Sequence, residues 1–291
     1  MNTENRVIIV SGLSGSGKSV ALHALEDLGY YCIDNLPAAL LASLIDEVTR
    51  PGENAASRIA VGVDARNPRE NLSTLPDEIL SLQASGIQTD LLFLQASDNV
   101  LLKRFGETRR RHPLTTGDSD LRTAIKRERD LLGPVINASD LFIDTTRLSV
   151  YELADAIRER VDRRTSRALS ILLQSFGFKH GIPTDADFVF DLRCLPNPYW
   201  QPELRSLTGL DTAVGEFLDA EETYLKMYEH ILGFLHSWIP EYIKVKRSYL
   251  TVALGCTGGQ HRSVYMTEKL AQALGDIHDS IHIRHNELGN N

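Results

Sequence analysis

Short runs of apolar residues, many of them β-branched, alternate with segments of helical periodicity through the first half of the chain. Each run is short and bounded by turn residues, which predicts a strand buried on both faces. Five such strands are expected: one that starts at Arg6, and others at 31–33, 58–63, 89–94 and 138–144. Strands that alternate with helices predict a parallel sheet, and ligands bind such a sheet at the carboxyl ends of its strands.

Local signals mark where several of the intervening helices begin. Pro37 suits the first turn of a helix that runs to about Val48, because its missing N–H would be unpaired there anyway. Ser149 and Glu152 have the spacing of a capping box, in which each side chain binds the backbone N–H of the other residue. Further helices are expected at 75–85 and from Asp98.

The pattern changes at 158–167, where five arginines interrupt the apolar periodicity. This segment is interpreted as a helix end and linker, and a basic patch that faces RNA is the alternative. Beyond it, strands are expected at 168–176, 187–192 and 247–254, and helices over most of 210–238 and from Val264. We therefore predict two domains, an α/β domain over 1–160 with a parallel sheet and a second, smaller α/β domain over 161–291.

Composition limits the class of protein and its partners. The 291 residues are 42% hydrophobic and 24% charged, and no apolar run approaches the roughly 18 residues of a membrane span. The first residues, MNTENR, lack the basic segment and apolar core of a signal peptide, so a cytoplasmic protein is expected. Three scattered cysteines form no disulfide framework, which agrees with a reducing compartment. The net charge of -8 confines any RNA contact to a local basic patch.

A glycine-rich loop with the Walker A spacing follows the first strand and precedes the first helix. Its glycines allow successive backbone N–H groups to point at phosphate oxygens, and the helix N-terminus favours an anion. Lys18 is expected to reach the β- and γ-phosphates, and the Ser19 hydroxyl to complete the shell of a Mg²⁺ ion. The first domain is thus predicted to be P-loop kinase-like and to bind a nucleoside triphosphate. The residues assigned to this loop are Gly12, Leu13, Ser14, Gly15, Ser16, Gly17, Lys18 and Ser19.

Asp64 follows the apolar strand at 58–63, which is the Walker B arrangement of a carboxylate that holds Mg²⁺. Ala65, Arg66 and Asn67 come next and are expected to line the same nucleotide. The alternative is that Asp64 is a turn or helix-cap residue. Lys18 and Asp64 are the candidate catalytic residues.

Residues 101–132 carry basic side chains on both sides of a turn that contains Pro, Gly, Thr and Asp. In P-loop kinases of small molecules, an arginine-bearing lid of this kind closes over the triphosphate and neutralises charge during phosphoryl transfer. We call residues 101–132 the lid segment. The alternative is a pair of solvated helix faces with acidic partners.

A second glycine-rich loop follows the strand at 247–254 and again precedes a helix, which is the arrangement of an anion-binding loop. Cys256, five further residues and Arg262 have the spacing by which cysteine phosphatases surround a phosphate. Gly255 stands where those phosphatases carry a histidine, and no clear loop supplies a general acid. Phosphate binding without catalysis, a phosphatase and a structural turn all remain open. The candidate anion ligands are Arg193, Cys256, Thr257, Gly258, Gly259, His261, Arg262 and Ser263.

Several long segments together resemble the RapZ (YvcJ) family of P-loop proteins. They include GLSGSGKSVALHALEDLGYYCIDNLP, VDARNP, TRRRHPL, LLQSFGFKHGIPTDADFVFDLRCLPNPYW and LTVALGCTGGQHRSVY. The resemblance implies ATP at Gly12 to Ser19, GTP at Asp64 to Asn67, weak hydrolysis of both, and a C-terminal domain that senses the phosphorylated amino sugar glucosamine-6-phosphate. It also implies an oligomeric adapter that presents small regulatory RNA to an endoribonuclease.

In that family, RNA contact draws on a basic C-terminal tail, whereas this chain ends DIHDSIHIRHNELGNN with no basic run. The candidate RNA contacts are Lys269, His282, Arg284 and His285. The C-terminal histidines have no recognisable metal-ligand spacing and are expected to be solvated or to contact a ligand. A small-molecule kinase that uses the lid segment and a phosphatase that uses Cys256 are the alternatives to the adapter.

Overall fold

The computed structural model describes residues 5–50, 56–108, 110–115, 120–162 and 169–288. The turn predicted at 50–54, Arg109, the tip of the lid segment and the second half of the linker predicted at 158–167 lie wholly or partly outside these ranges. The chain divides into two compact units, Met1–Asp162 and Arg163–Asn291, and each is described here by itself.

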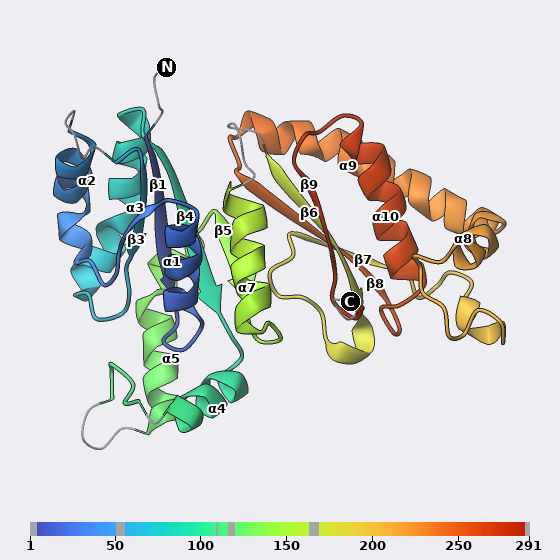
Figure 1. Cartoon of the computed structure of the whole chain (residues 1–291), viewed down its shortest axis with the longest axis horizontal. Coiled ribbons are helices and arrows are strands. Elements are labelled where there is room, and N and C mark those ends of the chain that lie inside the picture. The colour runs from blue at the N-terminus through green and yellow to red at the C-terminus, as the bar shows by residue number, and fades with distance from the viewer. Residues whose placement is uncertain (1–4, 51–55, 109, 116–119, 163–168, 289–291) are drawn as a thin grey trace. The chain divides into compact units, whose positions relative to one another are not determined.

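The N-terminal unit is built on the five-stranded parallel sheet that the sequence predicts (Figure 1). Its strand order is β2-β3-β1-β4-β5, so β1 lies in the middle, with β3 and β4 on either side. Every residue of β1 is buried, because helices cover both faces of a parallel sheet. The strands are β1 (Arg6–Gly12), β2 (Tyr31–Ile33), β3 (Arg58–Gly62), β4 (Gln88–Gln95) and β5 (Leu141–Asp144).

The helices of this unit follow the predicted positions with two differences. The segment after Pro37 opens with a short 3-10 turn before its α-helix, and the helix expected from residue 75 begins at Arg69 and contains Pro76. The capping box is confirmed: the Ser149 hydroxyl accepts the Glu152 N–H at 3.2 Å, and the Glu152 carboxylate accepts the Ser149 N–H at 2.7 Å. The helices are α1 (Lys18–Asp27), α2 (Leu41–Thr49), α3 (Arg69–Ala84), α4 (Asp98–Thr108), α5 (Leu121–Leu131), α6 (Gly133–Asn137) and α7 (Val150–Ile157).

The C-terminal unit has a four-stranded parallel sheet in the order β7-β8-β6-β9. Three of its strands are predicted from the sequence, whereas β9 is not. The strands are β6 (Ser170–Gly177), β7 (Phe188–Asp191), β8 (Tyr249–Cys256) and β9 (Ile281–His285). The helices are α8 (Thr212–Asp219), α9 (Glu222–Lys244) and α10 (Arg262–Gly275).

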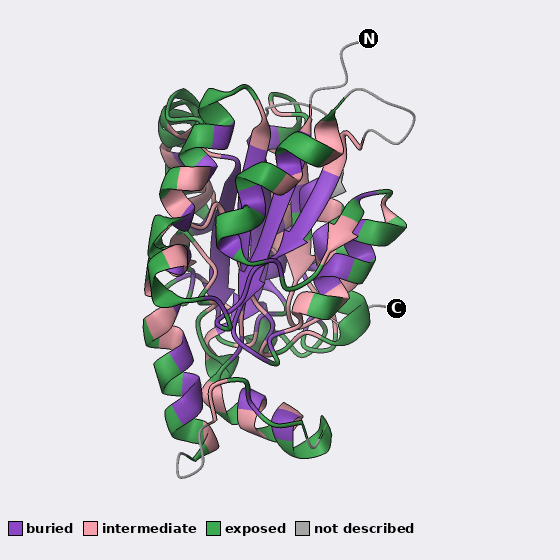
Figure 2. Cartoon of the chain, turned by 90° about the vertical axis from the view of Figure 1, so that its left-hand side faces the viewer, coloured by how far each residue is buried: buried purple, intermediate pink, exposed green. Residues whose placement is uncertain are grey.

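Each unit has its own hydrophobic core between sheet and helices. Ile9, Val61 and Phe93 belong to the first core, and Leu254 and Leu270 belong to the second. Figure 2 shows the buried strands of the N-terminal unit behind helices that are buried on one side and exposed on the other. Burial of these apolar faces fixes the sheet, and the sheet in turn places the loops at the carboxyl ends of its strands.

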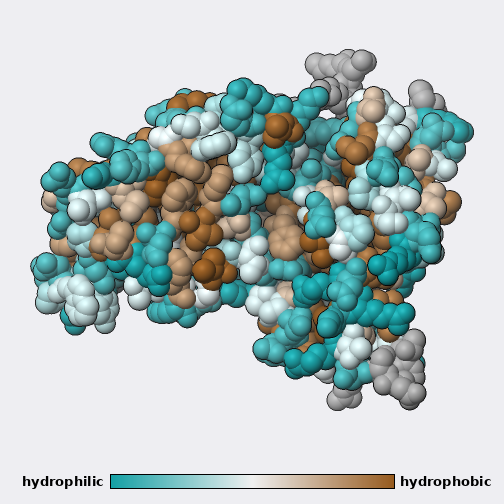
Figure 3. Space-filling model, turned by 180° about the vertical axis from the view of Figure 1, so that it is seen from behind, coloured by the Kyte–Doolittle hydropathy of each residue, from teal (hydrophilic) through white to brown (hydrophobic). Residues whose placement is uncertain are grey.

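Among the described helices, none combines the length and the apolar character needed to cross a membrane. The face shown in Figure 3 mixes hydrophobic with hydrophilic side chains.

Candidate nucleotide and anion sites

The Walker A loop joins the end of β1 to the start of α1 and depends on glycine at two positions. Gly12 and Gly17 have φ of 150° and 110°, a region that other residues rarely adopt. A Cβ atom on Gly12 would lie 2.3 Å from the carbonyl oxygen of Leu94, and one on Gly17 would lie 2.6 Å from Leu153 Cδ2. The loop therefore passes too close to β4 and α7 for any larger residue.

Lys18 lies along this loop and is held there by backbone oxygens. Its Nζ donates to the carbonyls of Gly12 at 2.7 Å and Leu13 at 3.4 Å. Burial lowers the pKa of Lys18, although the negative charges of Glu128 and Asp64 oppose that effect. A phosphate bound on the loop would offset the cost of burying this ammonium group.

Glu128 anchors the loop from α5 and was not found by sequence reasoning. Its buried carboxylate accepts the Ser14 N–H at 2.9 Å and the Ser14 hydroxyl at 2.6 Å. His112 Nε2 lies 3.1 Å from the same carboxylate. His112 Nδ1 accepts a hydrogen bond from the Leu114 N–H, so the ring proton is on Nε2. Nε2 is therefore the donor in the hydrogen bond to Glu128. Glu128 and His112 thus connect the lid segment to the phosphate-binding loop.

Arg104 holds the other side of the loop. Its Nη1 donates to the Gly15 carbonyl and to the Thr145 hydroxyl, each at 3.0 Å, and Nη2 donates to the Thr145 carbonyl at 2.8 Å. The Thr145 hydroxyl in turn donates to the Ser16 carbonyl at 2.8 Å. Of the basic residues predicted to form a lid, Arg104 therefore fixes the loop, whereas Arg110 and Arg111 line the cleft beside it.

Asp64 lies just beyond β3, and both its carboxylate oxygens bind Arg66. The Arg66 backbone N–H donates to Oδ1 at 2.9 Å, and Nη2 donates to Oδ2 at 2.6 Å. Burial raises the pKa of Asp64, but the bonds from Arg66 and the charge of Lys18 outweigh it and hold this pKa below its usual range. Asp64 is therefore ionised at neutral pH. Ser19 and Asp64 both offer oxygen, the donor that Mg²⁺ prefers, so the two residues fit the predicted metal site.

Ala65 and Asn67, the other two residues assigned to GTP, are buried. The Asn67 side chain accepts the Ala38 N–H at 2.6 Å and donates to the carbonyls of Leu36 and Asp64. It shapes the turn after β3. The contact of Ala65 and Asn67 with a nucleotide stays a prediction.

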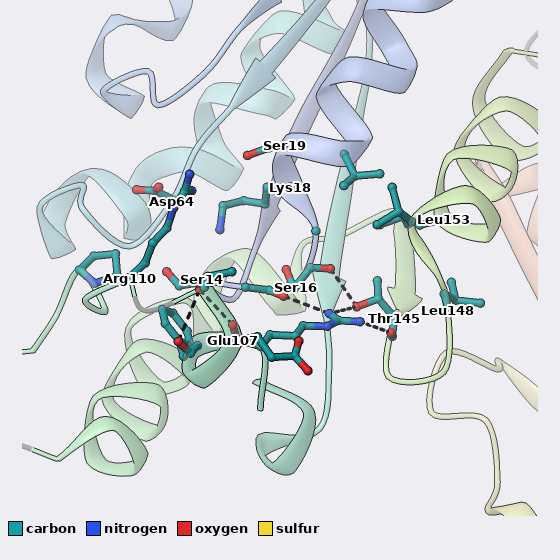
Figure 4. A pocket seen from close by; sticks show the side chains of 18 of the residues that line it. Ser14, Ser16, Lys18, Ser19, Asp64, Glu107, Arg110, Thr145, Leu148 and Leu153 are labelled. Atoms are coloured by element: carbon teal, nitrogen blue, oxygen red, sulfur yellow. Dashed lines mark hydrogen bonds between the residues drawn. The ribbon is translucent and has the colours of Figure 1, made fainter. Parts of the chain in front are cut away.

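A cleft of about 710 Å³ runs along the Walker A loop. In Figure 4, Asp64 and Arg110 lie at one end, Leu148 and Leu153 at the other, and Lys18 between them. The order suits a nucleotide whose phosphates lie over the loop and whose base meets the apolar end. Asp34, at the end of β2, also lines the cleft and was not among the predicted site residues.

The second glycine-rich loop joins β8 to α10, as predicted. The Gly259 N–H donates to Cys256 Sγ at 3.2 Å, and the Ser263 hydroxyl lies 3.2 Å from the same sulfur. Burial raises the pKa of Cys256, but these bonds and the charge of Arg262 outweigh it and lower the pKa. The loop therefore favours a negative charge at its centre.

Arg262 is buried beneath this loop. Its Nη1 donates to the carbonyls of Leu195 at 2.8 Å, Arg193 at 3.1 Å and Leu192 at 3.4 Å, and Nη2 donates to Thr257 Oγ1 at 3.3 Å. Its Nε is buried and has no hydrogen-bond partner among the described residues. Arg262 thus fixes the chain after β7 with one nitrogen and keeps a second donor for a ligand.

Two further cations flank the loop. The Arg193 guanidinium stacks on the Phe178 ring at 3.9 Å, and Lys179 Nζ lies 3.9 Å from where a Cβ on Gly258 would be. Lys179 was missed because it lies on a different loop, far away in sequence. His261 is buried with its Nε2 donating to the Leu204 carbonyl at 3.1 Å, and burial lowers its pKa. His261 is therefore neutral and positions the neighbouring chain.

In both units, an aspartate beside the glycine-rich loop is bound by the arginine two residues later in the chain. Arg193 binds Asp191 as Arg66 binds Asp64: the backbone N–H donates at 2.9 Å and Nη2 at 2.7 Å. In both units the pair follows the strand next to the one that carries the loop. Each loop therefore faces an arginine that is already paired with its own carboxylate.

The four residues predicted to contact RNA lie in regular secondary structure. His282, Arg284 and His285 belong to β9, and Lys269 to α10, where its ammonium group binds Asp219. Arg284 donates to Gln174 at 2.5 Å and pairs with Asp185, and His285 lies 2.9 Å from both Ser175 and Glu268. These side chains support the sheet, and their contact with RNA stays a prediction. No group of three or more His, Cys, Asp or Glu side chains suited to a metal ion occurs in the described part of the chain.

Comparison with known proteins agrees with this geometry. Residues 5–165 match the RapZ-like N-terminal domain, and residues 169–289 match the RapZ C-terminal domain. The chain belongs to the RapZ family. Proteins named nucleotide-binding protein from Halorhodospira halophila and Pseudomonas fluorescens are 52% and 50% identical to it over 283 residues. The alignments cover 97% of this chain and 98% and 99% of those proteins.

The RapZ-family domains and the structure together describe a two-domain α/β protein with a Walker A loop after its first strand. Among solved structures, a shikimate kinase from Bacteroides thetaiotaomicron is similar over 54% of this chain and 98% of its own, with 13% identity and a TM-score of 0.36.

Proposed function

We propose that this protein is a regulatory nucleotide-binding protein that takes ATP or GTP with Mg²⁺ in one cleft and hydrolyses them slowly. The observation that carries the proposal is the Walker A loop, with Lys18 held over it and an ionised Asp64 at the phosphate end. Asp64 lies at that end, away from Leu148 and Leu153, and it binds Arg66. Residues 64–67, at the phosphate end of the cleft, cannot distinguish adenine from guanine. ATP and GTP therefore compete for the same cleft.

Slow turnover follows from how the buried carboxylates near the loop are engaged. A general base must accept a proton from the attacking water. Glu128 already accepts bonds from Ser14 and His112, and Asp64 already binds Arg66. Neither carboxylate is arranged to activate water, which supports a binding protein with weak hydrolysis.

Replacing Asp64 with asparagine is expected to lower Mg²⁺-dependent hydrolysis by about 10- to 100-fold, because the neutral amide loses the charge that attracts the metal. Nucleotide affinity measured in EDTA is expected to change by less than about 3-fold, because Lys18 and the loop N–H groups remain. Hydrolysis is measured by phosphate release and affinity by titration calorimetry.

Asp77→Asn on the exposed face of α3 serves as the matched control and is expected to change neither quantity. Equal losses of hydrolysis and of metal-free affinity in Asp64→Asn would instead assign Asp64 a structural role in the turn that it forms with Arg66.

We further propose that the C-terminal loop senses a phosphorylated amino sugar, glucosamine-6-phosphate, without hydrolysing it. The buried Nε of Arg262, the N–H groups of the loop and the cations of Arg193 and Lys179 support phosphate binding. Two features argue against a phosphatase. The rings of Phe176 and Phe178 fill the space beside Gly255 that a histidine would need, and Arg193 lowers the pKa of Asp191, so that Asp191 is ionised and holds no proton to donate.

The adapter role is the part of the proposal that rests on the RapZ family alone. In it, an oligomer of this cytoplasmic protein binds a small regulatory RNA and presents it to an endoribonuclease. Purification from cells followed by sequencing of the bound RNA tests it, and recovery of one defined small RNA is expected. Recovery of RNA in proportion to its cellular abundance would contradict the adapter role and leave nucleotide binding untouched.

A further inference from the structure

The three cysteines lie in three different environments. Cys32 donates its thiol proton to the Leu22 carbonyl at 3.3 Å, and burial together with the charge of Glu26 raises its pKa to about 11. Cys194 is exposed. Cys256 is 3% exposed and receives the Gly259 N–H on its sulfur, with the Ser263 hydroxyl also in hydrogen-bond distance. Only the last arrangement stabilises a thiolate, because its bonds point toward the sulfur.

The surroundings of Cys256 add positive potential from independent sources. The 14-residue helix α10 begins at Arg262, so its N-terminus lies against the loop. Arg262 is itself 3% exposed, and its Nε has no hydrogen-bond partner within the described ranges. A buried donor without a partner is costly, and an anion bound in the loop would offset that cost. The sulfur of Cys256 therefore lies on the floor of an anion site. Two carboxylates lie beside it and have cationic partners already, Asp191 with Arg193 and Glu287 with His180.

We propose that Cys256 is a site of oxidation by hydrogen peroxide, and that its oxidation and the binding of a phosphate group in this loop exclude each other. The thiolate sulfur attacks one peroxide oxygen, an S–O bond forms, and the O–O bond breaks. Sulfur is oxidised to a sulfenic acid, and the departing hydroxide takes up a proton to become water. The new S–O group points where a phosphate oxygen would lie, so the oxidised loop no longer accepts a phosphate.

Peroxide can reach this thiol, whereas bulky reagents cannot. Thr257 is exposed and Gly258 partly exposed above the sulfur, and peroxide is similar in size to water. Ser263 is a positioning residue in this reaction, because its hydroxyl contacts the sulfur and stabilises the thiolate. The oxidation half of the inference stands by itself, and the exclusion half rests on the phosphosugar proposal.

The test treats the full-length protein with a limiting amount of peroxide for set times, removes the peroxide, unfolds the protein in the presence of dimedone, and quantifies labelled sulfenic acid at each cysteine by peptide mass spectrometry. At neutral pH, Cys256 is expected to be labelled at least about 10-fold faster than Cys194, because reactivity follows the thiolate fraction, and Cys32 is expected to stay unlabelled. In urea, the three rates should converge, which shows that the folded loop causes the difference.

Ser263→Ala is expected to slow labelling of Cys256 several-fold and to shift its pH profile upward, whereas Ser237→Ala on α9 changes neither. A structural role for Ser263 alone would leave the pH profile where it is. Equal labelling of Cys256 and Cys194 in the folded protein would overturn the proposal.

The same assay with glucosamine-6-phosphate or inorganic phosphate tests the exclusion, and protection of Cys256 but not of Cys194 is expected. Fast labelling without protection would show that the phosphosugar proposal fails while the thiolate assignment holds. A rise in melting temperature with phosphosugar, together with an unreactive Cys256, would show that the phosphosugar proposal holds and the thiolate assignment fails.

Discussion

Lys18→Ala is expected to weaken the binding of ATP and of GTP by at least about 100-fold, the equivalent of about 2.7 kcal/mol. The Lys18 ammonium group belongs to the Walker A loop itself and is fixed on it by the carbonyls of Gly12 and Leu13. Bonds from this group to phosphate oxygens would be charge-assisted and would form in a partly buried site. Alanine supplies neither the charge nor a donor, and water cannot replace both.

The melting temperature of the nucleotide-free protein is expected to fall little in this variant. Burial already lowers the pKa of Lys18, which means that its charge is costly to hold in the free protein. Lys103→Ala is the matched control, because Lys103 is an exposed residue of α4 whose ion pair with Glu107 is long, at 3.9 Å. Titration calorimetry with each nucleotide measures the effect.

Comparison of ATP with GTP in the Lys18→Ala variant also tests whether the two nucleotides share one cleft. If Lys18→Ala lost ATP but kept GTP, residues 64–67 would form a separate GTP site, and the single-cleft proposal would be wrong. Loss of both with an unchanged control places both triphosphates over one loop.

Local signals account for the parts of this structure that could be predicted from the sequence. The Walker A spacing, the capping box at Ser149 and the continuous apolar strands each depend on residues that are close together in the chain. Strand β9 was missed because its alternation of Ile with His and Arg resembles a polar tail. Its polar residues are accommodated by distant partners, such as Gln174 for Arg284.

The residues missed in the sites have the same explanation. Glu128 meets Ser14 across 114 positions, and Lys179 approaches Gly258 from a loop far away in the sequence. No spacing rule connects residues so far apart, and a buried glutamate in a basic amphipathic helix looks like one more surface charge. The motif identified the anion loop, but only the folded chain shows which donors are left for the anion.

Arg262→Ala is expected to be the most destabilising substitution in the C-terminal loop and to abolish phosphate binding as well. Alanine leaves the buried Leu195 carbonyl without the guanidinium donor, removes one bond each from the carbonyls of Leu192 and Arg193, and empties the space beneath the loop. Each orphaned buried acceptor costs about 1 to 3 kcal/mol, so a loss of about 3 to 5 kcal/mol in the free energy of unfolding is expected. Denaturant unfolding measures the stability, and the shift in melting temperature with glucosamine-6-phosphate measures the binding.

Because one residue serves both roles, a second variant is needed to separate them. Arg262→Lys keeps a positive charge and one donor group for the carbonyls but has no planar fork to reach the phosphate at the same time. It is expected to recover part of the stability and little of the ligand-induced shift, while Arg205→Ala, an exposed arginine against Tyr199, changes neither. If Arg262→Lys bound phosphosugar as tightly as the unmodified protein, the buried Nε would have no part in the site. The phosphate would then be held by Lys179, Arg193 and the loop N–H groups, and Arg262 would serve only to fix the chain after β7.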